Sequence, residues 1–238
     1  MKFYVDVGNT RIKWAIGSGD HWQQFGQHPT AQAAELDWSG WDAPSGQVWI
    51  SNVAGESVAQ QLRTACAARG WQARFIAAEA SQAGVFNGYA RPAQLGVDRW
   101  AALVGAWQGV RGAVVVVNCG TATTIETLSE QGVFLGGLIV PGLTLMLRSL
   151  NRATAQLPVG AGRYVAFPDN TQDALFSGAL QATLGAIERQ RAQSPHAALL
   201  LTGGAAQQVL PYLPDAVWVE HLVLQGISRL SEEMDETR

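Results

Sequence analysis

The chain has 238 residues, of which 47% are hydrophobic and 15% are charged, and its net charge is −3. This low charged fraction with ordinary apolar content excludes an intrinsically disordered chain, and the length suits one large domain or two modest lobes. The 16 Lys and Arg are outnumbered by 19 Asp and Glu and form no basic run. We therefore expect no nucleic-acid partner.

The sequence also predicts neither a membrane span nor a secretion signal. The uncharged stretch at residues 132–147 is shorter than the roughly 20 residues of a membrane helix, and Pro141 interrupts it. Near the amino terminus, Asp6 and Asn9 stand where a signal peptide needs an apolar core. We expect a cytoplasmic protein without a membrane partner. Its two cysteines form no CxxC pair, so a disulfide framework and a structural zinc site are not expected.

The first predicted elements form a β-hairpin. Residues 3–7 are mainly β-branched or aromatic, and Gly8-Asn9 is a turn dipeptide. Over residues 11–16, large apolar residues alternate with Arg11, Lys13 and Ala15. A strand at residues 48–51, a helix at 58–66 and a strand at 74–76 follow. We interpret this order as βαβ alternation in an α/β fold.

The next helix is predicted to begin at Asp98 as its N-cap and to end near Gly109, because apolar residues follow Asp98 at the spacing of one helical face. Residues 113–117 are continuously apolar, which is typical of a central strand. A hairpin-like segment then precedes a strand at residues 134–140.

Pro141-Gly142 breaks the chain before a predicted helix at residues 143–150. Asn170 and Asp173 are three residues apart and resemble a capping pair for a further helix. Residues 197–201 predict the last buried strand.

Three predicted strands end in small polar loops: Asp6-Val7-Gly8-Asn9-Thr10, Asn118-Cys119-Gly120-Thr121-Ala122 and Thr202-Gly203-Gly204. The first two loops begin alike, which we interpret as a weak internal repeat with lobes at residues 1–110 and 111–238. Glycine lets phosphate oxygens approach backbone N–H groups, and Asn and Thr add further donors. A hairpin turn and a strand end are the alternative interpretations of single loops, but all three together favour phosphate binding.

Charged residues near these loops suggest the chemistry. Asp6 suits Mg²⁺ bound through water, whereas Lys13 is either a phosphate ligand or a solvated strand residue. Asp98 and Arg99 follow Gly96 at the start of a helix, where a carboxylate could accept a proton and a guanidinium could hold an anion. The alternative is an N-cap beside a surface arginine. Neither GxxxxGK[ST] nor GxGxxG occurs.

Together, the residues 6–10 loop, Gly96-Val97-Asp98-Arg99, Gly120-Thr121-Ala122-Thr123, the segment Gly136-Gly137-Leu138-Ile139-Val140-Pro141-Gly142 and Thr202-Gly203-Gly204 resemble the type III pantothenate kinases. The match in order and spacing extends along nearly the whole chain. The resemblance implies a duplicated ribonuclease-H-like, two-lobed fold of the actin, Hsp70 and sugar-kinase superfamily. It also implies a homodimer and ATP-dependent phosphorylation of pantothenate, the first step of coenzyme A synthesis.

The resemblance also assigns residues to ligands. The first phosphate loop would be formed by Asp6, Val7, Gly8, Asn9, Thr10, Arg11, Ile12 and Lys13. Thr121 would contact ATP phosphates, and Gly203 and Gly204 would lie by the adenosine. Asp98 would be the proton acceptor. Pantothenate would be held by Tyr89, Gly96, Val97, Asp98 and Arg99, with Thr171 reaching across the dimer interface.

One residue departs from the family pattern. The family usually has Asp at the position of Asn118, where it binds a monovalent cation, K⁺ or NH₄⁺, near the phosphates. The neutral Asn118 puts that requirement in doubt. Two other functions remain open: a related kinase acting on a sugar or another small hydroxy substrate, and a nucleotide-binding regulator without turnover.

Overall fold

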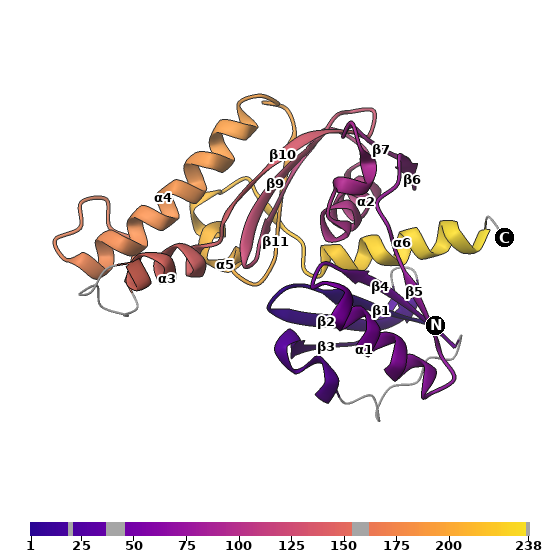
Figure 1. The fold of residues 1–238 in the computed structure, drawn as a ribbon. Helices are drawn as coiled ribbons and strands as arrows, with labels where there is room; N and C mark the ends of the chain where they lie inside the picture. Colours follow the sequence, from indigo (N-terminus) through magenta and orange to yellow (C-terminus); the bar gives the residue numbers. More distant parts are fainter. Residues whose placement is uncertain (19–20, 37–45, 154–161, 237–238) are drawn as a thin grey trace. The chain divides into compact units, whose positions relative to one another are not determined.

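The computed structural model describes residues 1–18, 21–36, 46–153 and 162–236. The chain forms two compact units (Figure 1). Unit 1 comprises Met1–Arg111, Gly132–Leu135 and His221–Arg238, and unit 2 comprises Gly112–Gln131 and Gly136–Glu220. The chain thus passes from unit 1 to unit 2 after Arg111, next to the predicted boundary at residue 110. Unit 1 also includes the carboxy-terminal segment, however. The assignment of lobes to residues 1–110 and 111–238 stays a prediction.

Unit 1 contains a five-stranded sheet with the order β3-β2-β1-β4-β5. Its strands are β1 (Lys2–Val7), β2 (Arg11–Ser18), β3 (His21–Pro29), β4 (Gln47–Asn52) and β5 (Gln72–Phe75). Strands β1, β2 and β3 pair antiparallel, whereas β1, β4 and β5 pair parallel. The short 3₁₀ helix η1 (Thr30–Glu35) follows β3.

Both faces of β1 are covered. Phe3, Val5 and Val7 are fully buried in a cluster that includes Leu62 of α1 (Glu56–Ala67). Because side chains alternate along a strand, Tyr4 lies on the opposite face, where its hydroxyl accepts a hydrogen bond of 3.2 Å from Ser228 Oγ. A strand buried on both faces is expected to be largely apolar, and Asp6 is the buried charged residue that departs from this pattern in β1.

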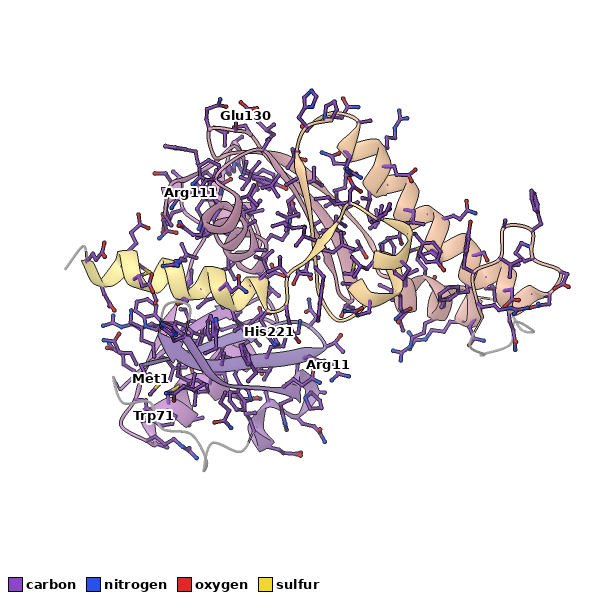
Figure 2. All side chains as sticks on the ribbon, turned by 180° about the vertical axis from the view of Figure 1, so that it is seen from behind. Met1, Arg11, Trp71, Arg111, Glu130 and His221 are labelled. Carbon is purple, nitrogen blue, oxygen red and sulfur yellow. The ribbon has the colours of Figure 1, made fainter. Side chains whose placement is uncertain are left out.

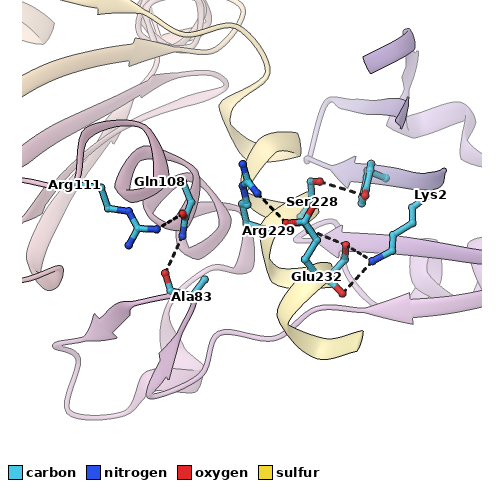
Figure 3. A network of polar contacts seen from close by, with 9 residues as sticks. Lys2, Ala83, Gln108, Arg111, Ser228, Arg229 and Glu232 are labelled. Atoms are coloured by element: carbon cyan, nitrogen blue, oxygen red, sulfur yellow. Dashed lines mark hydrogen bonds and ion pairs between the residues drawn. The ribbon is translucent and has the colours of Figure 1, made fainter. Parts of the chain in front are cut away.

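The helix α6 (Leu222–Glu236) carries Ser228 and packs against α2 (Val97–Val110). The two helices approach closely at glycines: a Cβ on Gly105 would lie 2.7 Å from the Leu222 carbonyl oxygen, and one on Gly226 would overlap the Ala101 carbonyl. The Lys2 ammonium donates to the Ser231 carbonyl at 3.2 Å and ties α6 to the first strand (Figure 3). Small residues and polar ties together fix α6 in unit 1.

The rest of unit 1 consists of β6 (Ser81–Gln82), β7 (Val85–Asn87) and the 3₁₀ helix η2 (Pro92–Gln94). The beginning of β10 (Val133–Pro141) belongs to unit 1 as well, where Val133 and Phe134 pair parallel with β7.

Unit 2 repeats the topology of unit 1. Its strands β8 (Val114–Cys119), β9 (Ala122–Leu128), β11 (Ala198–Thr202) and β12 (Val217–Trp218), with β10, have the order β10-β9-β8-β11-β12. β8 pairs antiparallel with β9 and parallel with β11, as β1 does with β2 and β4. The helices are α3 (Leu143–Ala153), α4 (Thr171–Arg191) and α5 (Ala206–Val209), with the 3₁₀ helix η3 (Leu210–Tyr212). This shared order confirms a duplicated fold.

Most predicted elements are confirmed, including the capping pair of α4: Asn170 Oδ1 accepts a hydrogen bond of 3.0 Å from the Asp173 N–H. The prediction that Asp98 is an N-cap is wrong. Helix α2 begins at Val97 after Gly96, and the Asp98 carboxylate instead accepts from the N–H of the next residue, Arg99, at 2.8 Å. Strand β3 and helix α6 were not predicted. No helix among the described residues is long and apolar enough to cross a membrane.

Candidate active site

The first candidate phosphate loop is the turn between β1 and β2 in unit 1. The Gly8 N–H donates to the Arg11 carbonyl oxygen at 3.0 Å, which closes the turn. Asn9, Thr10 and Arg11 are exposed, and Arg11 lies at the surface (Figure 2). The side chains of Val7 and Ile12 are instead fully buried in the core of unit 1. Only the backbone of these two residues therefore remains for a ligand.

Asp6 is the buried acid of this loop. It stands between Lys13 of β2 and Ser51 of β4 in the sheet register, and its side chain is 8% exposed. Burial raises the pKa of Asp6 to about 7; Lys13 opposes this, the Asp98 carboxylate adds to it, and Ser51 opposes it through a long hydrogen bond of 3.5 Å to Asp6 Oδ1. Asp6 is thus a carboxylate that would be stabilised by additional positive charge.

The donor chemistry of Asp6 fits a divalent cation. Carboxylate oxygens are hard ligands, and Mg²⁺ is commonly held through one or two carboxylates while it keeps several waters. No group of three or more His, Cys, Asp or Glu side chains that could hold a metal occurs among the described residues. A Mg²⁺ ion bound by Asp6 through water would keep most of its hydration shell.

Asp98 lies in the first turn of α2, half-buried. A Cβ on Gly96 would lie 2.8 Å from Asp98 Oδ1, so glycine gives this carboxylate room to turn back over the start of the helix. Burial raises the pKa of Asp98, although the N–H and the positive charge of Arg99 act against the increase. A carboxylate with a raised pKa is a stronger base than an ordinary one.

Arg99 is 7% exposed, which contradicts the alternative of a surface arginine. Its Nη1 donates to the Tyr89 hydroxyl at 3.2 Å, and its guanidinium lies 5.8 Å and 5.9 Å from the ring centroids of Tyr89 and Phe134. These are cation–π distances. The Asn87 carboxamide accepts from the Tyr89 N–H at 3.1 Å and donates to the Pro92 carbonyl at 3.2 Å, which holds the Tyr89 loop in place.

The candidate loops of unit 2 are joined to one another. Asn118 pairs with Thr202 in the register of β8 and β11, and the Ala205 N–H donates to the Cys119 carbonyl at 3.0 Å. Gly203 has a φ of 95°, and a Cβ there would lie 2.6 Å from Asn118 Oδ1, so this position requires glycine. The structure thus brings the predicted Asn118 and Gly203 together, while Gly204 is exposed.

Thr121 is held by the segment that precedes α3. The Gly142 N–H donates to the Thr121 carbonyl at 3.0 Å. A Cβ on Gly142 would lie 2.7 Å from that same oxygen and closer still to the Gly120 carbonyl. Gly142, which directly follows β10, therefore packs against the second candidate phosphate loop and holds it in place.

Thr171, the first residue of α4, lines a cavity of about 490 Å³ between α3 and α4. Its other walls are mainly apolar and include Met146, Leu150 and Leu175.

Sequence reasoning missed Ser51, Asn87 and the role of Gly142. Ser51 ends a predicted strand, so its position was visible, but its pairing with Asp6 depends on the parallel register of β1 and β4. Asn87 is the last residue of the short strand β7, and nothing in the sequence indicates its contacts.

Comparisons with known proteins bear on this arrangement. A family model described as type III pantothenate kinase matches residues 2–193. A relative from Nitrosospira multiformis, a type III pantothenate kinase, is 43% identical over 98% of this chain and 92% of its own.

Two solved structures share the fold. A conserved candidate transcriptional activator of the Baf family from Campylobacter jejuni has a TM-score of 0.70 at 21% identity, covering 98% of this chain and 99% of its own. A candidate 2-dehydro-3-deoxygalactonokinase from Sinorhizobium meliloti has a TM-score of 0.58 at 14% identity, also covering 98% and 99%. At these identities the likeness concerns the fold alone, which is a duplicated α/β fold.

Proposed function

This chain belongs to the type III pantothenate kinase family, and from that premise we propose how its residues carry out the family reaction. The enzyme phosphorylates pantothenate with ATP to give 4′-phosphopantothenate, the first step of coenzyme A biosynthesis. Because phosphoryl transfer needs mainly positioning and charge neutralisation, little covalent chemistry falls to the protein.

Asp98 is the proposed proton acceptor for the primary hydroxyl of pantothenate. The observation that supports it most strongly is the combination of a half-buried carboxylate with a raised pKa and a glycine that lets it turn back. As the hydroxyl attacks the γ-phosphorus, the bond from that phosphorus to the bridging oxygen of ADP breaks, and Asp98 Oδ takes the hydroxyl proton. Burial favours this role because it destabilises the charged carboxylate and so increases its affinity for a proton.

Arg99 is the proposed anchor for the carboxylate of pantothenate. A guanidinium can hold a carboxylate through two parallel hydrogen bonds. The aromatic rings of Tyr89 and Phe134 lie at cation–π distance from the guanidinium and help to hold it in place. Gly96 and Val97, which join this anchor to Asp98, complete the substrate segment.

Residues 6–13 are the proposed binding loop for ATP phosphates, with Lys13 contributing a positive charge. Asp6 would hold Mg²⁺ through water, and the ion would supply positive charge that neutralises the phosphates when bound. In unit 2, Thr121 would contact phosphate oxygens and Gly203-Gly204 would lie by the adenosine. Asn118 would offer a monovalent cation only a neutral carbonyl oxygen.

A homodimer is also proposed. Leu150, which lines the cavity at Thr171, is 44% exposed in the single chain, and Leu145 of the same helix is 42% exposed. Exposed large apolar groups beside an apolar cavity are typical of an interaction surface, and a second copy would bring Thr171 to its neighbour's substrate. Light scattering after gel filtration tests this, and a monomer at working concentration would contradict it. We expect neither nucleic acid nor a membrane as partner, and a cytoplasmic location.

The decisive experiment measures ADP release with MgATP and pantothenate, with and without K⁺, for wild type, Asp98→Asn and Asp215→Asn. Asp215 forms a surface ion pair with Arg191 in unit 2 and has no role in the proposed site. Asp215→Asn therefore makes the same chemical change as Asp98→Asn at a position without a catalytic role. We expect Asp98→Asn to lower kcat about 10²- to 10⁴-fold and Asp215→Asn to have little effect. Pantothenate-dependent turnover that survives in Asp98→Asn would disprove the role of Asp98.

A further inference from the structure

Thr30 lies 22 residues after Gly8 of the first phosphate loop but contacts that loop directly. It is the first residue of η1, and it is 7% exposed. Its hydroxyl donates to the Gly8 carbonyl oxygen at 2.7 Å, and its own N–H donates to the Thr10 carbonyl oxygen at 3.0 Å. One buried residue therefore holds two carbonyl groups of a turn that is otherwise exposed.

These two bonds determine which way the peptide groups of the loop point. In a planar trans peptide, the carbonyl of one residue and the N–H of the next point in opposite directions. Because Thr30 holds the Gly8 carbonyl, the Asn9 N–H must point away from Thr30. Backbone N–H groups presented together bind anions, whereas a carbonyl oxygen turned toward a phosphate would repel it.

The Thr30 hydroxyl has no part in capping its own helical turn. The N-cap of η1 is Pro29, and no side chain caps the helix. The short distance of 2.7 Å to Gly8 instead directs the hydroxyl to the loop. The Thr30 hydroxyl therefore contacts the loop and does not have the common role of a threonine that caps its own helix.

We propose that Thr30 is a positioning residue for ATP, which keeps the carbonyls of Gly8 and Thr10 turned away from the phosphates and so presents the loop N–H groups to them. This inference rests on the proposed assignment of residues 6–13 to the ATP phosphates. Thr30 itself does not touch the nucleotide in this proposal.

The test compares Thr30→Val, which keeps the shape and the backbone N–H but removes the hydroxyl, with Thr30→Ser, which restores the hydroxyl. Thr183→Val is a matched control, because Thr183 is also buried and its hydroxyl donates to a backbone carbonyl, that of Ala179, at 3.0 Å. The Kd of MgATP is measured by calorimetry without pantothenate, and the KM values for ATP and pantothenate are measured by ADP release.

We expect Thr30→Val to raise the Kd and the KM for ATP about tenfold, the usual scale for leaving a buried carbonyl unsatisfied, with the KM for pantothenate nearly unchanged. Thr30→Ser should return both ATP constants to within about threefold of wild type. Thr183→Val should lower the melting temperature without changing either constant. If Thr30→Val does not fold, Thr30→Ala is measured in the same way.

Unchanged ATP constants in Thr30→Val, or an equal change in Thr183→Val, would overturn the proposal. Failure of the proposed function has a different signature. A wild-type protein that binds MgATP but shows no pantothenate-dependent turnover would refute the function, while the calorimetric comparison would still decide the role of Thr30.

Discussion

Gly142→Ala tests whether the end of β10 supports the Thr121 loop. The added Cβ would lie 2.7 Å from the Thr121 carbonyl oxygen and 3.1 Å from its carbonyl carbon, and it would overlap the Gly120 carbonyl. All of these are backbone atoms that cannot rotate away, so the loop must shift. Overpacking of this kind costs about 1–3 kcal/mol, and loss of the 3.0 Å hydrogen bond from the Gly142 N–H adds about 1 kcal/mol.

We expect Gly142→Ala to lower the free energy of unfolding by about 2–4 kcal/mol and to raise the KM for ATP more than the KM for pantothenate. Urea unfolding and ADP-release kinetics measure the two effects. Gly185→Ala is the control, because a Cβ there meets nothing within 4 Å and alanine favours the interior of α4. The reasoning fails if Gly142→Ala is as stable as Gly185→Ala and has a wild-type KM for ATP.

Three further predictions follow from the same geometry. The pKa of Asp6 is raised from 3.8 to about 7, so the folded protein binds a proton at Asp6 more tightly than the unfolded chain does. Without divalent ions, the free energy of unfolding should therefore fall as pH rises from about 4 to about 7. Asp6→Asn should remove this part of the fall in urea titrations, and an unaltered pH profile would contradict it. Asn118→Asp should strengthen activation by K⁺ in steady-state assays, and an unchanged K⁺ response would refute this. Gly226→Ala should destabilise the protein by about 1–3 kcal/mol, because its Cβ would overlap the Ala101 carbonyl, whereas Gly109→Ala, which meets nothing, should not.

The sequence predicted the helices and strands better than the contacts between them. Alternation around Gly8-Asn9 is enough for the hairpin, because turn chemistry and strand period are local properties. The register that places Asp6 beside Ser51 is not local, since it depends on two strands more than forty residues apart. The same reason hides Thr30 and Asn87, whose roles consist entirely of contacts with distant or irregular backbone.

Asp98 was predicted as an N-cap because two positions at a helix start favour the same residue. Asp is favoured both as an N-cap and in the first turn of a helix, because both places lie near the positive end of the helix dipole. Which of the two positions Asp98 occupies depends on whether the helix begins after Gly96 or after Asp98 itself. A glycine two residues before the Asp is compatible with either start. The sequence pattern therefore located the carboxylate at the helix start but could not decide its orientation, on which its proposed role as proton acceptor depends.

The duplicated topology makes Asp6 and Asn118 equivalent, since each is the penultimate residue of the central strand of its sheet, β1 or β8. Asp6 stands between Lys13 and Ser51, whereas Asn118 stands between Thr124 and Thr202. Unit 1 therefore places a charged pair where unit 2 places only neutral donors and acceptors. A buried charge is costly unless it is balanced, and Lys13 provides that balance for Asp6 in unit 1. In the proposed assignment, the neutral residues around Asn118 would leave phosphate binding in unit 2 to hydroxyl and backbone groups.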